Sequence, residues 1–373
     1  MLSFFKTERN SALLLLATGI LGLIAANTSA ASIVTSVGDQ TVSFLGFDLG
    51  LRSFVMDFLM TGFFMLIGLE LKSEMHTGVF RDRRAIVLPA ASALLGAIVP
   101  AIVFLLVVGN TSQATSGWPI TMATDVTFAL AIFNVFAKSM PNSARTFLLS
   151  FAVIDDIIAI AVIAIFLGSG LNFAYLVATI FTVWAFHYVS RLTGVLGFIA
   201  SSIVVIAAWS FTHQAGIAPA VIGVVLGLVT ANERVEIIEN RLNPWVSFLV
   251  LPLFAFFATA VSLAGGLAIT SAMSIAILAR PLGKIVGINA GALLVRKFVK
   301  KPGFDDLRPG QIARISTLGG IGFTVALLIS DAVFGRGSQL ANQAIVATLI
   351  AMVISMLLGA IALATAKSKP KAL

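Results

Sequence analysis

Long runs of hydrophobic residues alternate with short polar segments from one end of the chain to the other. A helix that crosses a bilayer needs about 20 largely apolar residues. Twelve segments approach this length, at residues 11–27, 55–71, 86–108, 119–136, 147–167, 173–189, 194–211, 216–230, 245–263, 270–295, 311–331 and 341–366. The pattern predicts an all-α integral membrane protein with about twelve transmembrane helices, forming one domain over residues 1–373.

Composition supports a chain whose solvent is mostly lipid. Hydrophobic residues make up 59% of it and charged residues 11%, and the mean hydropathy is +1.05. A soluble protein of this length carries far more charge. The net charge of +8 is not a sign of nucleic-acid binding, because the basic residues fall in short loops and form no continuous stripe. The absence of cysteine excludes disulfides and thiolate metal sites.

The distribution of basic residues predicts the orientation. If both termini are cytoplasmic, inner segments hold 20 of the 24 basic residues and outer loops hold Arg52 and Arg336. The inner set is Lys6, Arg9, Lys72, Arg81, Arg83, Arg84, Lys138, Arg145, Arg191, Arg234, Arg241, Arg296, Lys297, Lys300, Lys301, Arg308, Arg314, Lys367, Lys369 and Lys371. Such a split follows the positive-inside rule, so we expect a multi-pass inner-membrane protein. The first run resembles a signal peptide, but with so many spans following it we expect a retained helix.

One outer connection, residues 32–49, has two readings. Gly38 and Asp39 lie between alternating stretches of high β-propensity, which favours a small hairpin. The alternative is a plain loop.

Ionisable side chains at membrane depth are few, and they form the functional shortlist. A carboxylate there costs about 2.5–3.5 kcal/mol. The adjacent Asp155 and Asp156 lie near the middle of residues 147–167. Because the two charges repel, their protonation is coupled, and the pair is suited to hold either a proton or a small cation. The remaining members are Asp57, Asp125, Arg280 and Lys284.

Helix geometry constrains how these charges meet. Adjacent residues point about 100° apart, so Asp155 and Asp156 cannot face the same direction. We expect one to face an aqueous cavity and the other a cation on a neighbouring helix. Arg280 and Lys284 are one turn apart and share a face, so either is a candidate for that cation. The alternative is that these charges are structural ion pairs.

Two of the predicted spans are interrupted. Residues 119–136 contain Pro119 and polar residues around Asp125, and residues 311–331 contain Gly319, Gly320 and Gly322. Paired interruptions indicate a transporter built from inverted repeats, here about 86–167 and 270–366, whose broken helices cross at the bilayer midplane. At such a crossing, half-helix N-termini are partly positive and C-termini partly negative. Asp125 would offset the first, and Arg280 or Lys284 the second.

Five segments occur in the order found in the NhaA-type sodium/proton antiporters, which the chain resembles over nearly its whole length. They are Phe63-Phe64-Met65-Leu66-Ile67-Gly68-Leu69-Glu70-Leu71-Lys72; Ala123-Thr124-Asp125 with Phe128-Ala129-Leu130; Ile154-Asp155-Asp156; Asn243-Pro244-Trp245-Val246 through Leu251-Pro252-Leu253-Phe254-Ala255-Phe256; and Gly319-Gly320-Ile321-Gly322-Phe323-Thr324. The resemblance implies a secondary transporter, not an enzyme, without a cofactor. It further implies that Asp155 and Asp156 bind Na⁺ or Li⁺ in competition with H⁺, supported by Asp125 and Thr124.

The same resemblance implies an electrogenic exchanger and a homodimer assisted by the outer hairpin. It also assigns a pH response to carboxylates at the cytoplasmic mouth. In this chain these are Glu70, Glu74 and Glu239, for which the alternative reading is ordinary solvated charge.

The chain departs from the family pattern at several positions. Arg280 stands where the family usually has a lysine, and Lys284 follows one turn later. Arginine stays protonated, whereas a buried lysine can release its proton, so a proton-carrying role would pass to Lys284 or be lost. Histidines common in the family are replaced at Ala218, Asn240 and Asn243, which argues against a histidine-based pH switch at those positions.

Two other functions are alternatives to cation/proton exchange. A sodium-coupled solute symporter can also have broken helices and buried acids, but it needs a roomier polar pocket. An intramembrane aspartyl protease needs one aspartate on each of two facing helices, whereas Asp155 and Asp156 are adjacent. The sequence therefore favours a pH-dependent sodium (lithium)/proton antiporter with alternating access, and the symporter is the alternative.

Overall fold

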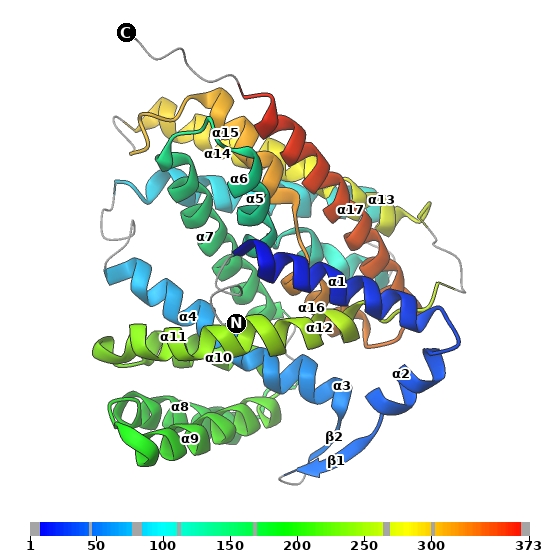
Figure 1. Ribbon diagram of the computed structural model, residues 1–373, viewed down its shortest axis with the longest axis vertical. Helices are drawn as coiled ribbons and strands as arrows, with labels where there is room; N and C mark the ends of the chain where they lie inside the picture. Colours follow the sequence, from blue (N-terminus) through cyan, green and yellow to red (C-terminus); the bar gives the residue numbers. More distant parts are fainter. Residues whose placement is uncertain are drawn as a thin grey trace. The chain divides into compact units, whose positions relative to one another are not determined.

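The computed structural model describes residues 8–44, 47–76, 84–109, 113–166, 170–263, 269–299 and 303–366 (Figure 1). Helices make up nearly all of the described structure. By their internal contacts the residues group into two units. Of the described residues, the first unit contains those within Leu14–Arg81 and Ile160–Ala260, and the second contains those within Thr7–Leu13, Asp82–Ala159 and Val261–Leu373. Both predicted repeats fall almost entirely in the second unit. The predicted inner basic residues outside the described part are Lys6, Arg81, Arg83, Lys300, Lys301, Lys367, Lys369 and Lys371.

The first unit contains most of α1 and the elements on either side of the central repeat. These are α1 (Glu8–Ala26), α2 (Ala31–Gly38), β1 (Thr41–Phe44), β2 (Phe47–Gly50), α3 (Leu51–Ser53), η2 (Phe54–Leu59), α4 (Met60–His76), α8 (Phe173–Val189), α9 (Gly194–Gln214), α10 (Ala220–Val229), η5 (Asn232–Arg234), α11 (Val235–Trp245), η6 (Val246–Val250) and α12 (Leu251–Thr259). Two of them, η2 and η6, are π-helical turns that continue directly into α4 and α12.

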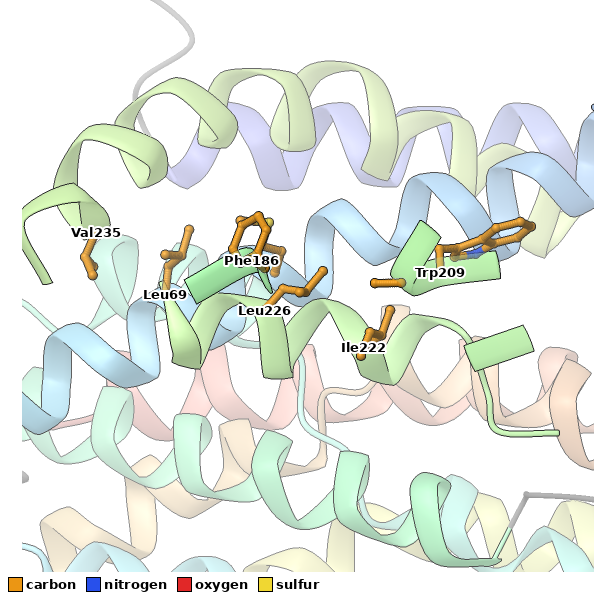
Figure 2. Packing of buried hydrophobic residues seen from close by; sticks show 8 residues of the cluster. Leu69, Phe186, Trp209, Ile222, Leu226 and Val235 are labelled. Atoms are coloured by element: carbon orange, nitrogen blue, oxygen red, sulfur yellow. The ribbon is translucent and has the colours of Figure 1, made fainter. Parts of the chain in front are cut away.

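The core of the first unit forms where α4 meets α8, α9 and α10 (Figure 2). Leu69 of α4, Phe186 of α8, Trp209 of α9 and Leu226 of α10 are buried against one another. Helices α4 and α10 can approach closely because glycines line their contact: a Cβ at Gly223 would meet the α4 backbone. Small residues allow such close packing between helices in lipid.

The second unit contains both interrupted segments. Its elements are α5 (Val87–Val108), η4 (Gln113–Thr121), α6 (Val126–Phe136), α7 (Asn142–Phe166) up to Ala159, α13 (Ala272–Leu278), α14 (Arg280–Phe298), α15 (Pro309–Ser316), η7 (Thr317–Gly320), α16 (Thr324–Phe334) and α17 (Gln339–Ala364).

The closest helix pair of the second unit is α5 with α14. Glycines repeat every fourth residue along α14, at Gly283, Gly287 and Gly291. A Cβ at Gly283 would lie 2.9 Å from the Cα of Pro100, and Cβ atoms at the other two would collide with α5 carbonyl oxygens. This glycine row fixes the position of α14, and with it the positions of Arg280 and Lys284.

Each of the twelve predicted spans overlaps a long apolar helix, a bent helix pair or a shorter apolar helix in the described structure. Six helices are long and apolar enough to cross a membrane alone, and four bent pairs bring the total to ten. The number of crossings beyond this stays a prediction. The predicted span at residues 270–295 is not one continuous helix, because the axis bends by 47° between α13 and α14, at Ala279. Pro281 explains the break, since a proline has no N–H to donate to the carbonyl four residues earlier and its ring clashes with that carbonyl.

Two antiparallel strands do occur between the first two predicted spans, as expected, but they do not flank Gly38 and Asp39. Residues 31–38 form the helix α2, and Asp39 caps its C-terminal end. Strands β1 and β2 follow, paired antiparallel from Thr41 with Gly50 to Phe44 with Phe47. The paired strands thus begin after Gly38, because residues 33–37, despite their β-propensity, are part of the helix α2.

Candidate functional site

The two interrupted segments contact each other through their backbones. The axis bends by 42° between η4 and α6, and by 45° between the α15–η7 segment and α16. At the breaks, the Asp125 N–H donates to the Ile321 carbonyl at 2.7 Å, and the Thr124 hydroxyl donates to the Gly319 carbonyl at 2.7 Å. These bonds satisfy groups that a continuous helix would satisfy internally.

Asp125 caps the N-termini of two half-helices at once. One carboxylate oxygen accepts from the Thr127 and Phe128 N–H groups at 3.1 and 3.3 Å, at the start of α6. The other accepts from the N–H and the hydroxyl of Thr324, at 3.2 and 2.9 Å, at the start of α16. Helix N-termini are partly positive, so this buried carboxylate offsets both half-helix N-termini at the crossing, as the sequence predicts.

Arg280 takes the complementary position at a helix C-terminal end. Its Nη2 donates to the Gly322 carbonyl at 3.3 Å, just past the end of η7, and the side chain is completely buried. A Cβ at position 322 would lie 2.5 Å from the arginine Nη1, so glycine there leaves room for the guanidinium. Arg280 is therefore the cation that offsets the partial negative charge predicted at this end.

Lys284, not Arg280, pairs with the aspartate. Its Nζ lies 2.7 Å from both carboxylate oxygens of Asp155, and both side chains are completely buried. The Phe151 ring lies 5.9 Å from the ammonium. Thr124 also lies beside Asp155, so the residues following η4 reach the pair. Removing one partner of a buried ion pair leaves an uncompensated charge, so another cation that takes the place of the ammonium would be stabilised beside Asp155.

Asp156 completes a compact charge cluster. It is buried on α7, and its charge acts on Lys284 together with those of Asp155 and Arg280. With Asp125, the cluster contains three carboxylates and two basic groups. When all are ionised it carries one formal negative charge, which one proton or one monovalent cation neutralises.

The second unit thus brings together six predicted residues: Thr124, Asp125, Asp155, Asp156, Arg280 and Lys284. The other predicted residues belong to the first unit. Asp57 is half-buried in η2. Glu70 and Glu74 lie on α4 and Glu239 on α11, two helices that pack together. The negative charges of Glu239 and Glu74 act on Glu70, so these three form their own acidic group.

One buried acid, Asp331, is not among the residues that the sequence analysis proposes. Asp331 lies in the last turn of α16 with 4% of its surface exposed. It was overlooked because it stands at the very end of the predicted span 311–331. Its position seven residues after Thr324 on the same apolar helix is the signal that could have found it.

The chain matches the family model described as Na+/H+ antiporter 1 over residues 2–363. It belongs to this family. The Na⁺/H⁺ antiporter NhaA 2 of Clavibacter michiganensis is 36% identical, over 97% of this chain and 91% of the relative. NhaA of Mycolicibacterium smegmatis is 34% identical, over 96% and 86%. This antiporter is therefore a multi-pass membrane transporter of Na⁺ and H⁺.

A solved structure has a similar fold. The sodium proton antiporter MjNhaP1 from Methanocaldococcus jannaschii gives a TM-score of 0.57 over 94% of this antiporter and 90% of that chain, at 14% sequence identity. At this identity the likeness concerns the fold alone.

Proposed function

We propose that the antiporter exchanges Na⁺ or Li⁺ for H⁺ at the cluster of Asp155 and Asp156, by alternating access and with a rate that depends on pH. The observation that carries this proposal is the ion pair between Asp155 and Lys284. Both carboxylate oxygens accept from the ammonium, so Na⁺ can use them only when Lys284 withdraws. Cation and proton then compete for one set of groups, which makes the exchange obligatory.

Lys284 is the exchangeable cation in this proposal, and Arg280 is a fixed one. A buried lysine can lose its proton, whereas a guanidinium remains charged. When Na⁺ arrives, Lys284 leaves Asp155 and releases its proton, and the departure of Na⁺ lets it take up a proton and return. Arg280 remains bonded to the Gly322 carbonyl and maintains the crossing. Asp125 acts with it as a positioning residue, and Asp156 supplies further oxygens to the cation.

At low cytoplasmic pH, the protonated Lys284 stays on Asp155 and a proton occupies Asp156, so Na⁺ is excluded. As the pH rises the site ionises, Na⁺ enters from the cytoplasm, and the site reorients outward. Outer protons then displace the ion. Glu70, Glu74 and Glu239 are the candidates for the pH response. The inner-membrane location, cytoplasmic termini and a homodimer assisted by β1 and β2 belong to the same proposal, supported by the basic-residue distribution and the family.

The test uses purified antiporter in acid-loaded liposomes with the membrane potential clamped. Internal pH is followed after NaCl, LiCl, KCl or choline chloride is added outside. Alkalinisation by Na⁺ and Li⁺ alone is expected. No response to any cation between about pH 6 and 9 would contradict the proposal, and sodium-dependent uptake of an organic solute would favour the symporter.

A further inference from the structure

Asp331 is a buried acid that the exchange mechanism above does not use. Its carboxylate lies in the apolar interior of the second unit, in the last turn of α16. Two effects disfavour it there. Burial at membrane depth costs about 2.5–3.5 kcal/mol, and an anion near a helix C-terminus is opposed by the helix dipole.

The position of Asp331 relates it to the charge cluster. Seven residues separate it from Thr324, so the two side chains lie on nearly the same face of α16, about 10 Å apart along its axis. Thr324 donates to Asp125 through its hydroxyl and its N–H. One face of a single helix thus connects the crossing to Asp331.

The two elements that pack most extensively against α16 bring no charge of their own to it. They are η4 and α17, and neither has an ionisable side chain within its bounds. The next charged residue along the chain is the exposed Arg336, in the connection to α17. Within these three elements Asp331 is the single group that can accept a proton.

Buried hydroxyls on α17 supply an independent observation. Thr348 and Ser355 are completely buried, and neither hydroxyl has a hydrogen-bond partner among the described residues. They are seven residues apart on α17, and Ser355 lies beside Gly320 at the interruption. Buried polar groups are normally satisfied by protein or by water, so these hydroxyls mark a place for hydrogen-bonding solvent that begins at the crossing.

We propose that Asp331 is the outer relay carboxylate of the antiporter. A proton from the outer solution adds to an Asp331 oxygen, and the same proton passes along the α16–α17 face to the midplane carboxylates as Na⁺ leaves. The orientation that places this end of α16 outside follows from the proposed function, on which the inference rests.

The experiment uses right-side-out liposomes loaded with Na⁺, in which protons enter from the outer face. The exchange rate is measured against outer pH at fixed inner pH for Asp331→Asn, Asp331→Glu and the control Ser330→Ala, whose buried hydroxyl bonds only the Ala326 carbonyl. We expect Asp331→Asn to lose at least about tenfold in rate, with Na⁺ binding by the solubilised protein unchanged within about twofold. Asp331→Glu should retain exchange with a shifted outer-pH profile, and Ser330→Ala should match the wild type.

A wild-type rate and outer-pH profile in Asp331→Asn would overturn the relay. So would loss of Na⁺ binding in parallel with rate, which indicates a structural role. If Asp331→Asn does not fold, Asp331→Glu decides, and an unshifted outer-pH profile contradicts the proposal. Exchange that is absent in the wild type would instead refute the proposed function itself.

Discussion

Replacing Lys284 by methionine removes the cation from the Asp155 ion pair and leaves the volume of the side chain nearly unchanged. Asp155 would then remain completely buried opposite an apolar group. Removing one partner of a buried ion pair destabilises a protein by about 3–5 kcal/mol, since it leaves a charge uncompensated. For a chain of 373 residues, this corresponds to a fall in Tm of roughly 5 °C.

Sodium should reverse this loss. In Lys284→Met, Na⁺ no longer has to displace an ammonium from Asp155, so it binds the folded state directly. A ligand at a hundred times its Kd stabilises the folded state by about 2.7 kcal/mol. We therefore expect the Tm of Lys284→Met to rise more with NaCl or LiCl than that of the wild type, and to stay low in choline chloride.

The assay is thermal unfolding in detergent, followed by the fluorescence of the 4 tryptophans. Lys297→Met is the matched control, because this lysine lies on the same helix but is exposed. Its replacement should change stability by less than about 0.5 kcal/mol. An unchanged Tm of Lys284→Met in choline chloride, or a loss that Na⁺ and choline restore equally, would refute the reasoning.

Three further predictions follow from the crossing and from the helix contacts. Asp125→Ala removes the caps of α6 and α16 together, at about 1–2 kcal/mol each, whereas Asp125→Asn keeps an acceptor and should recover part of that stability in thermal unfolding. Gly287→Ala places a Cβ against the α5 backbone and should lower both Tm and exchange rate. Gly310→Ala, which meets open space, should change neither. Finally, because protons and Na⁺ compete, the apparent KM for Na⁺ should rise as pH falls while the maximal rate is unchanged; a constant KM would exclude a shared site.

The two helix interruptions could be predicted because they depend on the residue types at those positions. Pro119 and the glycines at 319, 320 and 322 disfavour helix directly, whatever surrounds them. The α13–α14 break could also have been predicted from Pro281, but a long apolar run concealed it. The strand position could not, because the preference of residues 33–37 for helix or strand depends on what they pack against.

The site shows the same division. Ionisable residues inside long apolar segments are easy to recognise in a sequence. Five of the six residues at the crossing could therefore be predicted from hydropathy alone, and Thr124 could be predicted from the family pattern. The sequence could not decide whether Arg280 or Lys284 is the partner of Asp155. The two share a helix face one turn apart, and the depth of α14 against α5, set by the glycine row, decides which one meets the aspartate.

The central claim is that Na⁺ and H⁺ compete at Asp155 and Asp156. It is tested most directly by sodium-driven alkalinisation of acid-loaded liposomes containing Asp156→Asn, with Asp57→Asn as the control because that acid lies outside the cluster. The account predicts no exchange in Asp156→Asn, with the folded state preserved, and exchange near the wild-type rate in Asp57→Asn. Substantial sodium/proton exchange in Asp156→Asn would contradict it.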